Sequence, residues 1–298
     1  MKNRIAFGIV IVLLLITSCA TAYVTSLTIV DDPSATPSNI SSTANARFNY
    51  TDINGKNYQI DNNMWGIPSH GQDGVCEVFT ETLAGVPAFG WSWNTWHGED
   101  VLAYPEIGYG ISPNGGGSWG SKKDFPATIK SLAGKTVTAN IDVVSKYSDN
   151  GIWDLAFDVW VTPGSGANTA NNSYEIMIWL DRNRQVPSGT DIMDNFSYTD
   201  TKGTKDFVVY ATKHNEIKAD GYSWTCLSYI DSDSVNAPDS TYYSDPSFNI
   251  SAFVNDAVTR FAGYGLKDTF YISSIEFGNE VIDGSGITEI KNWSITVQ

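Results

Sequence analysis

Short runs of alternating apolar and polar residues recur along this chain, and Gly, Pro, Asn or Asp separates one run from the next. A period of two is typical of β-strands, because successive side chains of a strand point to opposite faces. The clearest runs, by residue number, are 136–144, 153–161, 174–180, 206–211, 222–230, 269–277 and 290–297. Runs of this length and spacing predict an antiparallel sandwich.

One segment has the periodicity of a helix instead. Apolar side chains recur at helical spacing within residues 248–263, where Ser251 is placed to cap the helix and Gly263 to end it. The predicted fold class is therefore an all-β sandwich of two antiparallel sheets with one short helix. The chain shows no internal repeat.

The strand predicted at 174–180 carries an acid in its middle. Alternation places Tyr174 on an apolar face and puts Glu175, Met177 and Trp179 together on the other face. A glutamate beside a large aromatic is unfavourable in a core but suits a sugar cleft. There, aromatic faces stack on pyranose rings, and a carboxylate attacks or stabilises the anomeric carbon. Glu175 is thus the first candidate for chemistry.

Glycoside hydrolysis uses two carboxyl groups, so a second acid is expected on the same face. Near the C-terminus, alternation puts Glu276 and Glu280 on one face, and spacing alone leaves both as candidates. Gly278 between them leaves room for a ligand or another backbone segment to approach. Asp158 interrupts a further apolar strand, where a buried aspartate is placed to share a proton with Glu175. One such acid alone would fit a solvent-facing strand position, but three together favour a site.

The N-terminus predicts export. Lys2 and Arg4 precede an apolar run at 5–16 that is too short to span a membrane comfortably. Residues 16–19 resemble a lipobox, in which Cys19 is lipidated after cleavage, while 18–22 also fit an ordinary small-residue cleavage site. We predict a signal peptide at 1–22, a flexible Ser/Thr/Pro-rich linker at 23–46 and a catalytic domain at 47–298. The expected location is extracellular, with any membrane contact made through a lipid on Cys19.

Composition narrows the partners. Aromatic residues make up 13% of the chain, with 10 Trp and 15 Tyr, which fits strand-rich structure or a carbohydrate surface. The net charge of −15 argues against a nucleic-acid partner, because the phosphate backbone would repel the chain. A neutral polymer meets no such repulsion, and solubility alone also explains the acidity. We expect a monomer.

Cysteine and histidine offer little further chemistry. Two cysteines follow the leader, Cys76 and Cys226, and the sequence leaves open whether they form a disulfide or remain buried thiols. None of the three histidines, His70, His97 and His214, pairs with another at metal-ligand spacing, so we predict neither a metal site nor a cofactor. His97 follows a tryptophan and would fit a substrate contact, although a polar loop residue is the simpler interpretation.

Four segments together carry a family resemblance. They are, in chain order, Asn62-Asn63-Met64-Trp65-Gly66 with the downstream Gly74-Val75-Cys76, then Ala156-Phe157-Asp158-Val159-Trp160, Tyr174–Leu180 and Phe277-Gly278-Asn279-Glu280. In residue types and in order they resemble glycoside hydrolase family 12, the small retaining cellulases. The resemblance spans roughly residues 48–298, and the strand Tyr174–Leu180 is its most specific part.

The resemblance implies a jelly roll of two antiparallel sheets, one of them bent around an open cleft. It implies that Glu175 is the nucleophile and Glu280 the acid/base, with Asp158 hydrogen-bonded to the nucleophile. It also implies the residues that line the glucose-binding cleft, namely Asn63, Trp65, Met177 beneath the reactive sugar, and Trp179.

These observations predict a retaining endo-β-1,4-glucanase that hydrolyses cellulose or soluble β-glucans by double displacement and needs no cofactor. Two alternatives remain open from the sequence. One is hydrolysis of xyloglucan or mixed-linkage β-glucan. The other is a non-catalytic carbohydrate-binding sandwich, which would keep exposed tryptophans but would have no need of Glu175, Asp158 and Glu280.

Overall fold

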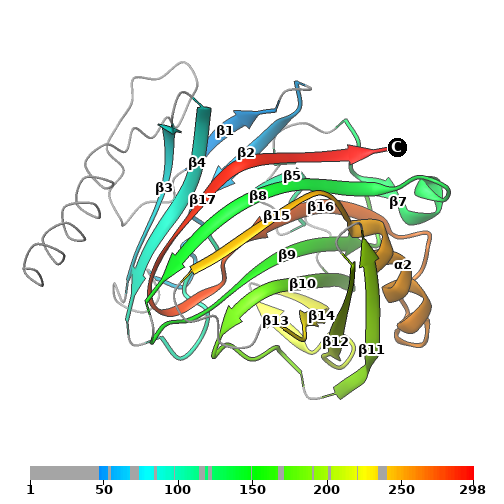
Figure 1. The fold of residues 1–298 in the computed structure, drawn as a ribbon. Helices are drawn as coiled ribbons and strands as arrows, with labels where there is room; N and C mark the ends of the chain where they lie inside the picture. The colour runs from blue at the N-terminus through cyan, green and yellow to red at the C-terminus, as the bar shows by residue number, and fades with distance from the viewer. Residues whose placement is uncertain are drawn as a thin grey trace, which may run out of the picture.

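The structure is a computed structural model that describes residues 47–52, 55–67, 74–83, 86–96, 98–113, 118–119, 123–148, 150–166, 171–189, 191–200, 203–219, 221–233 and 240–298. The predicted signal peptide, the linker up to residue 46, Cys19, His70 and His97 lie outside the described residues. Within the described part, strands dominate and two sheets form a sandwich, as the sequence predicted (Figure 1).

The larger of the two sheets, called the large sheet below, has the strand order β1-β2-β5-β16-β9-β10-β14-β12-β11. Three short strands also belong to this sheet: β6 pairs with β5, β7 with β16 and β13 with β14. The bounds are β1 Arg47–Thr51, β2 Asn57–Asp61, β5 Glu106–Ile111, β6 Ser118–Trp119, β7 Ala127–Thr128, β9 Ile152–Thr162, β10 Ser173–Asn183, β11 Asp191–Asp200, β12 Gly203–Ala211, β13 Ile217–Ala219, β14 Tyr222–Asp231 and β16 Tyr271–Gly278.

The other sheet, called the small sheet, has the order β3-β4-β17-β8-β15. Its strands are β3 Gly74–Leu83, β4 Val86–Thr95, β8 Val137–Tyr147, β15 Ser240–Asn249 and β17 Val281–Val297. The first residues of β17 also pair with β9, so this long strand connects the two sheets directly after the end of β16. Figure 1 shows β17 running beside β8 along the small sheet.

The pairing differs from the expectation in one place. β10 and β14 run parallel, with Glu175 opposite Cys226, whereas the other named strand pairs are antiparallel. Parallel neighbours need a long crossover, and here the chain between β10 and β14 first forms β11, β12 and β13. Sequence periodicity predicts where strands occur but not which strands pair or in which direction they run. It therefore could not predict this parallel pair.

The core lies between the two sheets and follows the alternation that was read from the sequence. Along β10, Tyr174, Ile176, Ile178 and Leu180 belong to the main apolar cluster, while Met177 belongs to a separate apolar group on the opposite face of the large sheet. That opposite face, turned away from the core, is called the outer face below. The predicted division of the strand into two faces is confirmed.

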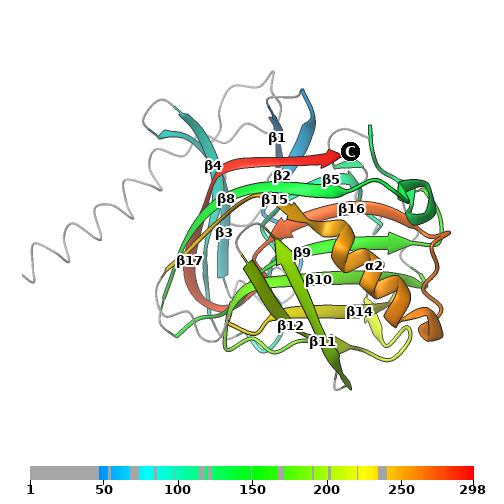
Figure 2. The same cartoon turned by 45° about the vertical axis from the view of Figure 1, so that its right-hand side comes forward.

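The α-helix α2 (Ile250–Arg260) packs against β8 and β10 (Figure 2). The predicted cap was wrong: Asn249 is the N-cap and its side chain accepts from the backbone N–H of Ala252 at 3.2 Å. Ser251 instead accepts from the backbone N–H of Val137 at 2.8 Å, which ties the helix to β8. The predicted end was also wrong, because Gly265 and not Gly263 adopts the left-handed conformation, after a short 3₁₀ turn (η3, Ala262–Tyr264). Among the described residues, no helix has the length and apolarity that crossing a membrane requires.

Candidate active site

The acids predicted from the sequence converge on the outer face of the large sheet. Glu175 and Met177 lie on β10, and Asp158 of β9 stands opposite Met177. On the other side of β9, Glu276 of β16 stands opposite Asp158. Residues opposed across a sheet share one face, so three adjacent strands place acids side by side. Glu280 follows the end of β16, in the short connection to β17.

Glu175 is held by two donors from β14. The indole Nε1 of Trp224 donates to its Oε2 at 2.8 Å, and the Cys226 thiol is also hydrogen-bonded to its carboxylate. Burial raises the pKa of Glu175 above its ordinary value, and the Glu280 carboxyl raises it further, while these two hydrogen bonds lower it. The donors therefore stabilise the ionised form of Glu175, and Glu280 is the acid whose charge it feels most. Nothing in the pattern of the sequence singled out Trp224.

Asp158 acts on Glu175 through charge. It lies diagonally from Glu175 across the β9–β10 pair and is only 4% exposed. Burial raises the pKa of Asp158 well above its ordinary value, and Glu175 makes the largest charge contribution. Its Oδ1 accepts no hydrogen bond from the described residues. The hydrogen bond to Glu175 that the family resemblance implied is not among those seen in the described part of the chain, and it stays a prediction.

Asn279 anchors the connection that carries Glu280. It is fully buried, and its Nδ2 donates to the backbone oxygen of Asp154 at 2.6 Å. Its Oδ1 accepts from Trp91 Nε1 at 2.8 Å and from Thr288 Oγ1 at 2.7 Å. Because β9, β4 and β17 each contribute one of these partners, the backbone just before Glu280 is fixed from three strands.

The Glu280 carboxyl has its own partners. Gln185 Nε2 donates to its Oε2 at 2.5 Å, and its carboxyl is also hydrogen-bonded to that of Asp154. Burial raises the pKa of Glu280, and these two hydrogen bonds lower it. A group that must donate a proton near neutral pH needs a raised pKa, a condition that Glu280 meets and that Glu175 meets as well.

Gly278 has the role that a glycine in a strand often has, which is to admit another backbone. A Cβ atom at this position would lie 2.3 Å from the backbone oxygen of Pro105. The sequence left open whether a ligand or another chain segment approaches here, and the structure places the segment before β5 against Gly278.

Glu106 is an acid that the sequence reasoning missed. It lies on β5 opposite Gly278 of β16 and is fully buried. Its Oε1 accepts from Asn63 Nδ2 at 2.8 Å, and its Oε2 has no donor among the described residues. Burial raises the pKa of Glu106 well above its ordinary value, and Glu276 raises it further. The alternation Glu106-Ile107-Gly108-Tyr109-Gly110-Ile111 was the signal that would have placed Glu106 on the outer face.

Tyr104 lies among these acids. Its hydroxyl donates to the backbone oxygen of Ala156 at 3.2 Å, and the side chain is 5% exposed. Burial raises the pKa of Tyr104, and the carboxyls of Asp158, Glu106 and Glu276 raise it further. The phenol is therefore a buried neighbour of those three carboxyls.

The four predicted cleft residues have different surroundings. Trp65 is 55% exposed, which leaves a large part of its ring accessible to a ligand. Met177 and Trp179 are 4% and 1% exposed and pack with Ala156 in the apolar group of the outer face. Asn63, at a positive φ of 36°, is bonded to Glu106 as described above. Trp65 therefore offers an exposed ring for stacking, whereas Trp179 is buried in the apolar group of the outer face.

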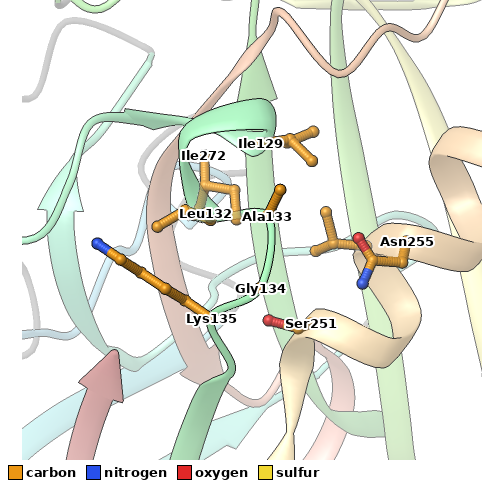
Figure 3. A pocket seen from close by; sticks show the side chains of 9 residues that line it. Ile129, Leu132, Ala133, Gly134, Lys135, Ser251, Asn255 and Ile272 are labelled. Carbon is orange, nitrogen blue, oxygen red and sulfur yellow. The ribbon is translucent and has the colours of Figure 1, made fainter. Parts of the chain in front are cut away.

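Other features of the described residues add no competing site. Cys76 and Cys226 are both buried free thiols. No group of three or more His, Cys, Asp or Glu within the described ranges has the arrangement of a metal site. A small cavity of about 50 Å³ lies between α2 and the turn after the 3₁₀ helix η2 (Ile129–Leu132), with Ser251 and Asn255 on the helix side (Figure 3). None of the nine described residues that line it is acidic, so it is no candidate for hydrolysis.

Glycoside hydrolysis uses two carboxyl groups, and Glu175 and Glu280 are two acids with raised pKa values, of which Glu280 is the charge that most affects Glu175. The model of glycosyl hydrolase family 12 matches residues 56–298. The chain belongs to glycosyl hydrolase family 12. A glycosidase of this family acts on a polysaccharide, and the jelly-roll sandwich described above is the fold of its solved members.

Relatives of this family 12 chain include Endoglucanase S of Pectobacterium parmentieri. It is 27% identical over 252 residues, which cover 81% of this chain and 82% of the relative. Among solved structures, a family 12 xyloglucanase from Bacillus licheniformis has a TM-score of 0.65 at 25% identity, covering 86% of this chain and all of that one. Endoglucanase cel12A from Rhodothermus marinus has a TM-score of 0.57 at 20% identity, covering 86% and 99%, and supports the fold alone.

Proposed function

We propose that this family 12 chain is a retaining endo-β-1,4-glucanase, with Glu175 as nucleophile and Glu280 as acid/base. The observation that carries the proposal is the pairing of these two acids. Glu280 is the charge that most affects Glu175, yet only Glu175 is held by the Trp224 indole and the Cys226 thiol. The Trp224 indole N–H stabilises an ionised Glu175, and the repulsion between the two carboxyls then favours a proton on Glu280.

In the proposed reaction, the protonated Glu280 donates to the glycosidic oxygen while ionised Glu175 attacks the anomeric carbon. This forms a glycosyl–enzyme bond and releases the first product. Glu280, now ionised, takes a proton from water, and the resulting hydroxide displaces Glu175. Asn279 supports both steps because it fixes the backbone that carries Glu280. Trp65 is the proposed stacking surface for a glucose ring.

Glu175→Gln and Glu280→Gln test the proposal directly. Each should lower kcat on carboxymethylcellulose by several orders of magnitude, because each removes a group that reacts in the transition state. Glu99→Gln, at an exposed position, is the matched control and should keep normal activity. Proton NMR of the first products should show the β-anomer before mutarotation. Appearance of the α-anomer first would mean inversion, and full activity of Glu175→Gln would favour the non-catalytic sugar-binding alternative.

Xyloglucan hydrolysis is the second candidate, because the Bacillus licheniformis structure that this chain resembles is a xyloglucanase. Reducing-sugar release from carboxymethylcellulose, xyloglucan and lichenan, compared as kcat/KM, distinguishes the candidates. A value for xyloglucan at least tenfold above that for the unbranched glucans would replace the endoglucanase proposal with a xyloglucanase.

We also propose that the chain is exported and that Cys19 tethers it. The support is the basic start and the apolar run at 5–16, followed by Cys19 and a Ser/Thr/Pro-rich segment. Cys19→Ala should move the protein from the membrane fraction to the medium, as detected by immunoblot. Wild-type protein found in the medium would leave export standing but remove the tether, and protein confined to the cytoplasm would contradict both.

A further inference from the structure

The acid partner of Glu280 is an unexplained feature of this site. Asp154 is fully buried, lies on β9 four residues before Asp158 and therefore shares the outer face. Its backbone N–H donates to the backbone oxygen of Glu280 at 3.1 Å. Its carboxyl Oδ1 accepts from the backbone N–H of Glu280 at 3.1 Å. The first bond joins the two backbones and the second joins the Asp154 carboxyl to the Glu280 backbone, so Asp154 is held beside Glu280 without any contribution from the Glu280 carboxyl.

The carboxyl groups themselves also meet. The side chains of Asp154 and Glu280 are hydrogen-bonded to each other, and the Asp154 Oδ2 is buried with no amine, amide or hydroxyl donor among the described residues. Two carboxylates repel, so a hydrogen bond between them requires one proton. Gln185 donates to Glu280 and not to Asp154. When the pair holds one proton, this donor therefore favours the negative charge on Glu280 and the proton on Asp154.

We propose that Asp154 is a positioning residue that shares a single proton with Glu280 and keeps the pair singly protonated before the reaction. This proposal rests on the proposed acid/base role of Glu280. In the first step the pair would give its proton to the leaving oxygen, and in the second it would recover one from water. Between the steps both carboxyls would be ionised and adjacent, which makes the pair a stronger base for that water.

Other charged groups surround this pair and share its titration. Glu175 on β10 raises the pKa of Asp154, and both carboxyls of the pair raise the pKa of Asp158 on β9. Tyr104 faces Asp154 from the segment before β5. Arg182 of β10 stands opposite Asp154 in register, and its Nη1 donates to the Gln185 backbone oxygen. A single acid cannot be assigned one isolated pKa in this setting, so the pair must be titrated as a unit.

Carbon-13 NMR of protein labelled at the Asp and Glu carboxyl carbons tests the sharing. In the wild-type protein, the Asp154 and Glu280 signals should move together in two steps that are well separated in pH. Asp154→Asn keeps the shape and one oxygen acceptor but cannot ionise. In that variant the Glu280 midpoint should lie at least about one pH unit below the upper step of the wild-type pair, because the Asp154 charge no longer opposes its ionisation.

Asp142→Asn is the matched control, since Asp142 lies on β8 of the small sheet, and it should leave the Glu280 titration unchanged. Independent wild-type midpoints for the two signals would overturn the proposal without any variant, even if Asp154→Asn failed to fold. An unchanged Glu280 midpoint in Asp154→Asn would overturn it as well. Failure of the proposed function is distinct: full activity of Glu280→Gln would remove the acid/base role while leaving the shared proton intact.

Discussion

At the scale of single residues, what the sequence could predict was which side chains share a face. Period-two alternation turned Glu175 away from the core and left Glu276 and Glu280 as rival second acids; the structure places Glu175, Asp158 and Glu276 on adjacent strands and Glu280 in the connection after β16. It could not predict which donors reach them. Trp224 meets Glu175 because β14 lies parallel to β10, a pairing that depends on chain segments far apart in sequence.

Trp224→Phe should shift the pH dependence of the reaction. It removes the indole N–H that donates to Glu175 while it keeps an aromatic ring. A hydrogen bond to a charged group contributes about 1.5 kcal/mol, and one pH unit corresponds to about 1.4 kcal/mol. Losing this donor raises the pKa of Glu175 further, so the acidic limb of kcat/KM should move up by about one unit. Trp160→Phe, which trims the neighbouring ring at 5.7 Å, is the control, and equal shifts in both variants would contradict the assignment.

The two predicted cleft tryptophans should respond differently to truncation. Trp65→Ala should weaken oligosaccharide binding by about 1 kcal/mol with little effect on unfolding, because its ring is largely exposed. Trp179→Ala should instead lower the free energy of unfolding by about 3–5 kcal/mol, the usual cost of emptying a buried aromatic site. Calorimetric titration with cello-oligosaccharides and chemical denaturation check the pair. Unchanged stability of Trp179→Ala would show that this ring is not packed within the apolar group of the outer face.

At the scale of elements, the sequence predicted where strands occur but not which residues contact one another between them. Each strand run read from the sequence corresponds to an observed strand, whereas β10 carries a bulge between Trp179 and Asp181 that no local pattern announces. The helix shows the same limit. Asn249 and Ser251 are both acceptable caps by residue type, and only the contact of Ser251 with Val137 on β8 decides between them.

Gly278→Ala should disturb the element that presents Glu280. Its Cβ would approach the Pro105 backbone oxygen to 2.3 Å, and backbone cannot rotate away as a side chain can. We expect a loss of about 2 kcal/mol in unfolding free energy, typical of overpacking, together with reduced kcat. Gly263→Ala is the matched control, because nothing lies within 4 Å of its added Cβ, and it should be neutral or slightly stabilising. Identical denaturation curves for the two variants would contradict the close approach.

At the scale of the whole molecule, the excess of acidic over basic residues seen in the composition has a local counterpart. The outer face gathers Glu106, Asp154, Asp158 and Glu276 on adjacent strands, with little exposure to solvent. Net charge could be read from the sequence, but this concentration could not, because it arises from strands that are distant along the chain. Burying acids together stores a cost that the protein meets by keeping some of them protonated.

That cost predicts how stability depends on pH. Burial raises the pKa of Glu106 well above its ordinary value, so between its unfolded and folded pKa values the folded chain binds more protons than the unfolded chain. The free energy of unfolding should therefore fall as pH rises through this window, by about 1.4 kcal/mol for each unit by which the pKa is raised. Glu106→Gln removes this contribution, so its stability relative to the wild type should increase as pH rises above the ordinary pKa of a glutamate. Glu99→Gln deletes one exposed charge instead, and its difference from the wild type should stay nearly constant. Thermal unfolding followed by circular dichroism at several pH values measures both differences, and a Glu106→Gln difference that does not change with pH would show that this carboxyl is ionised within the fold.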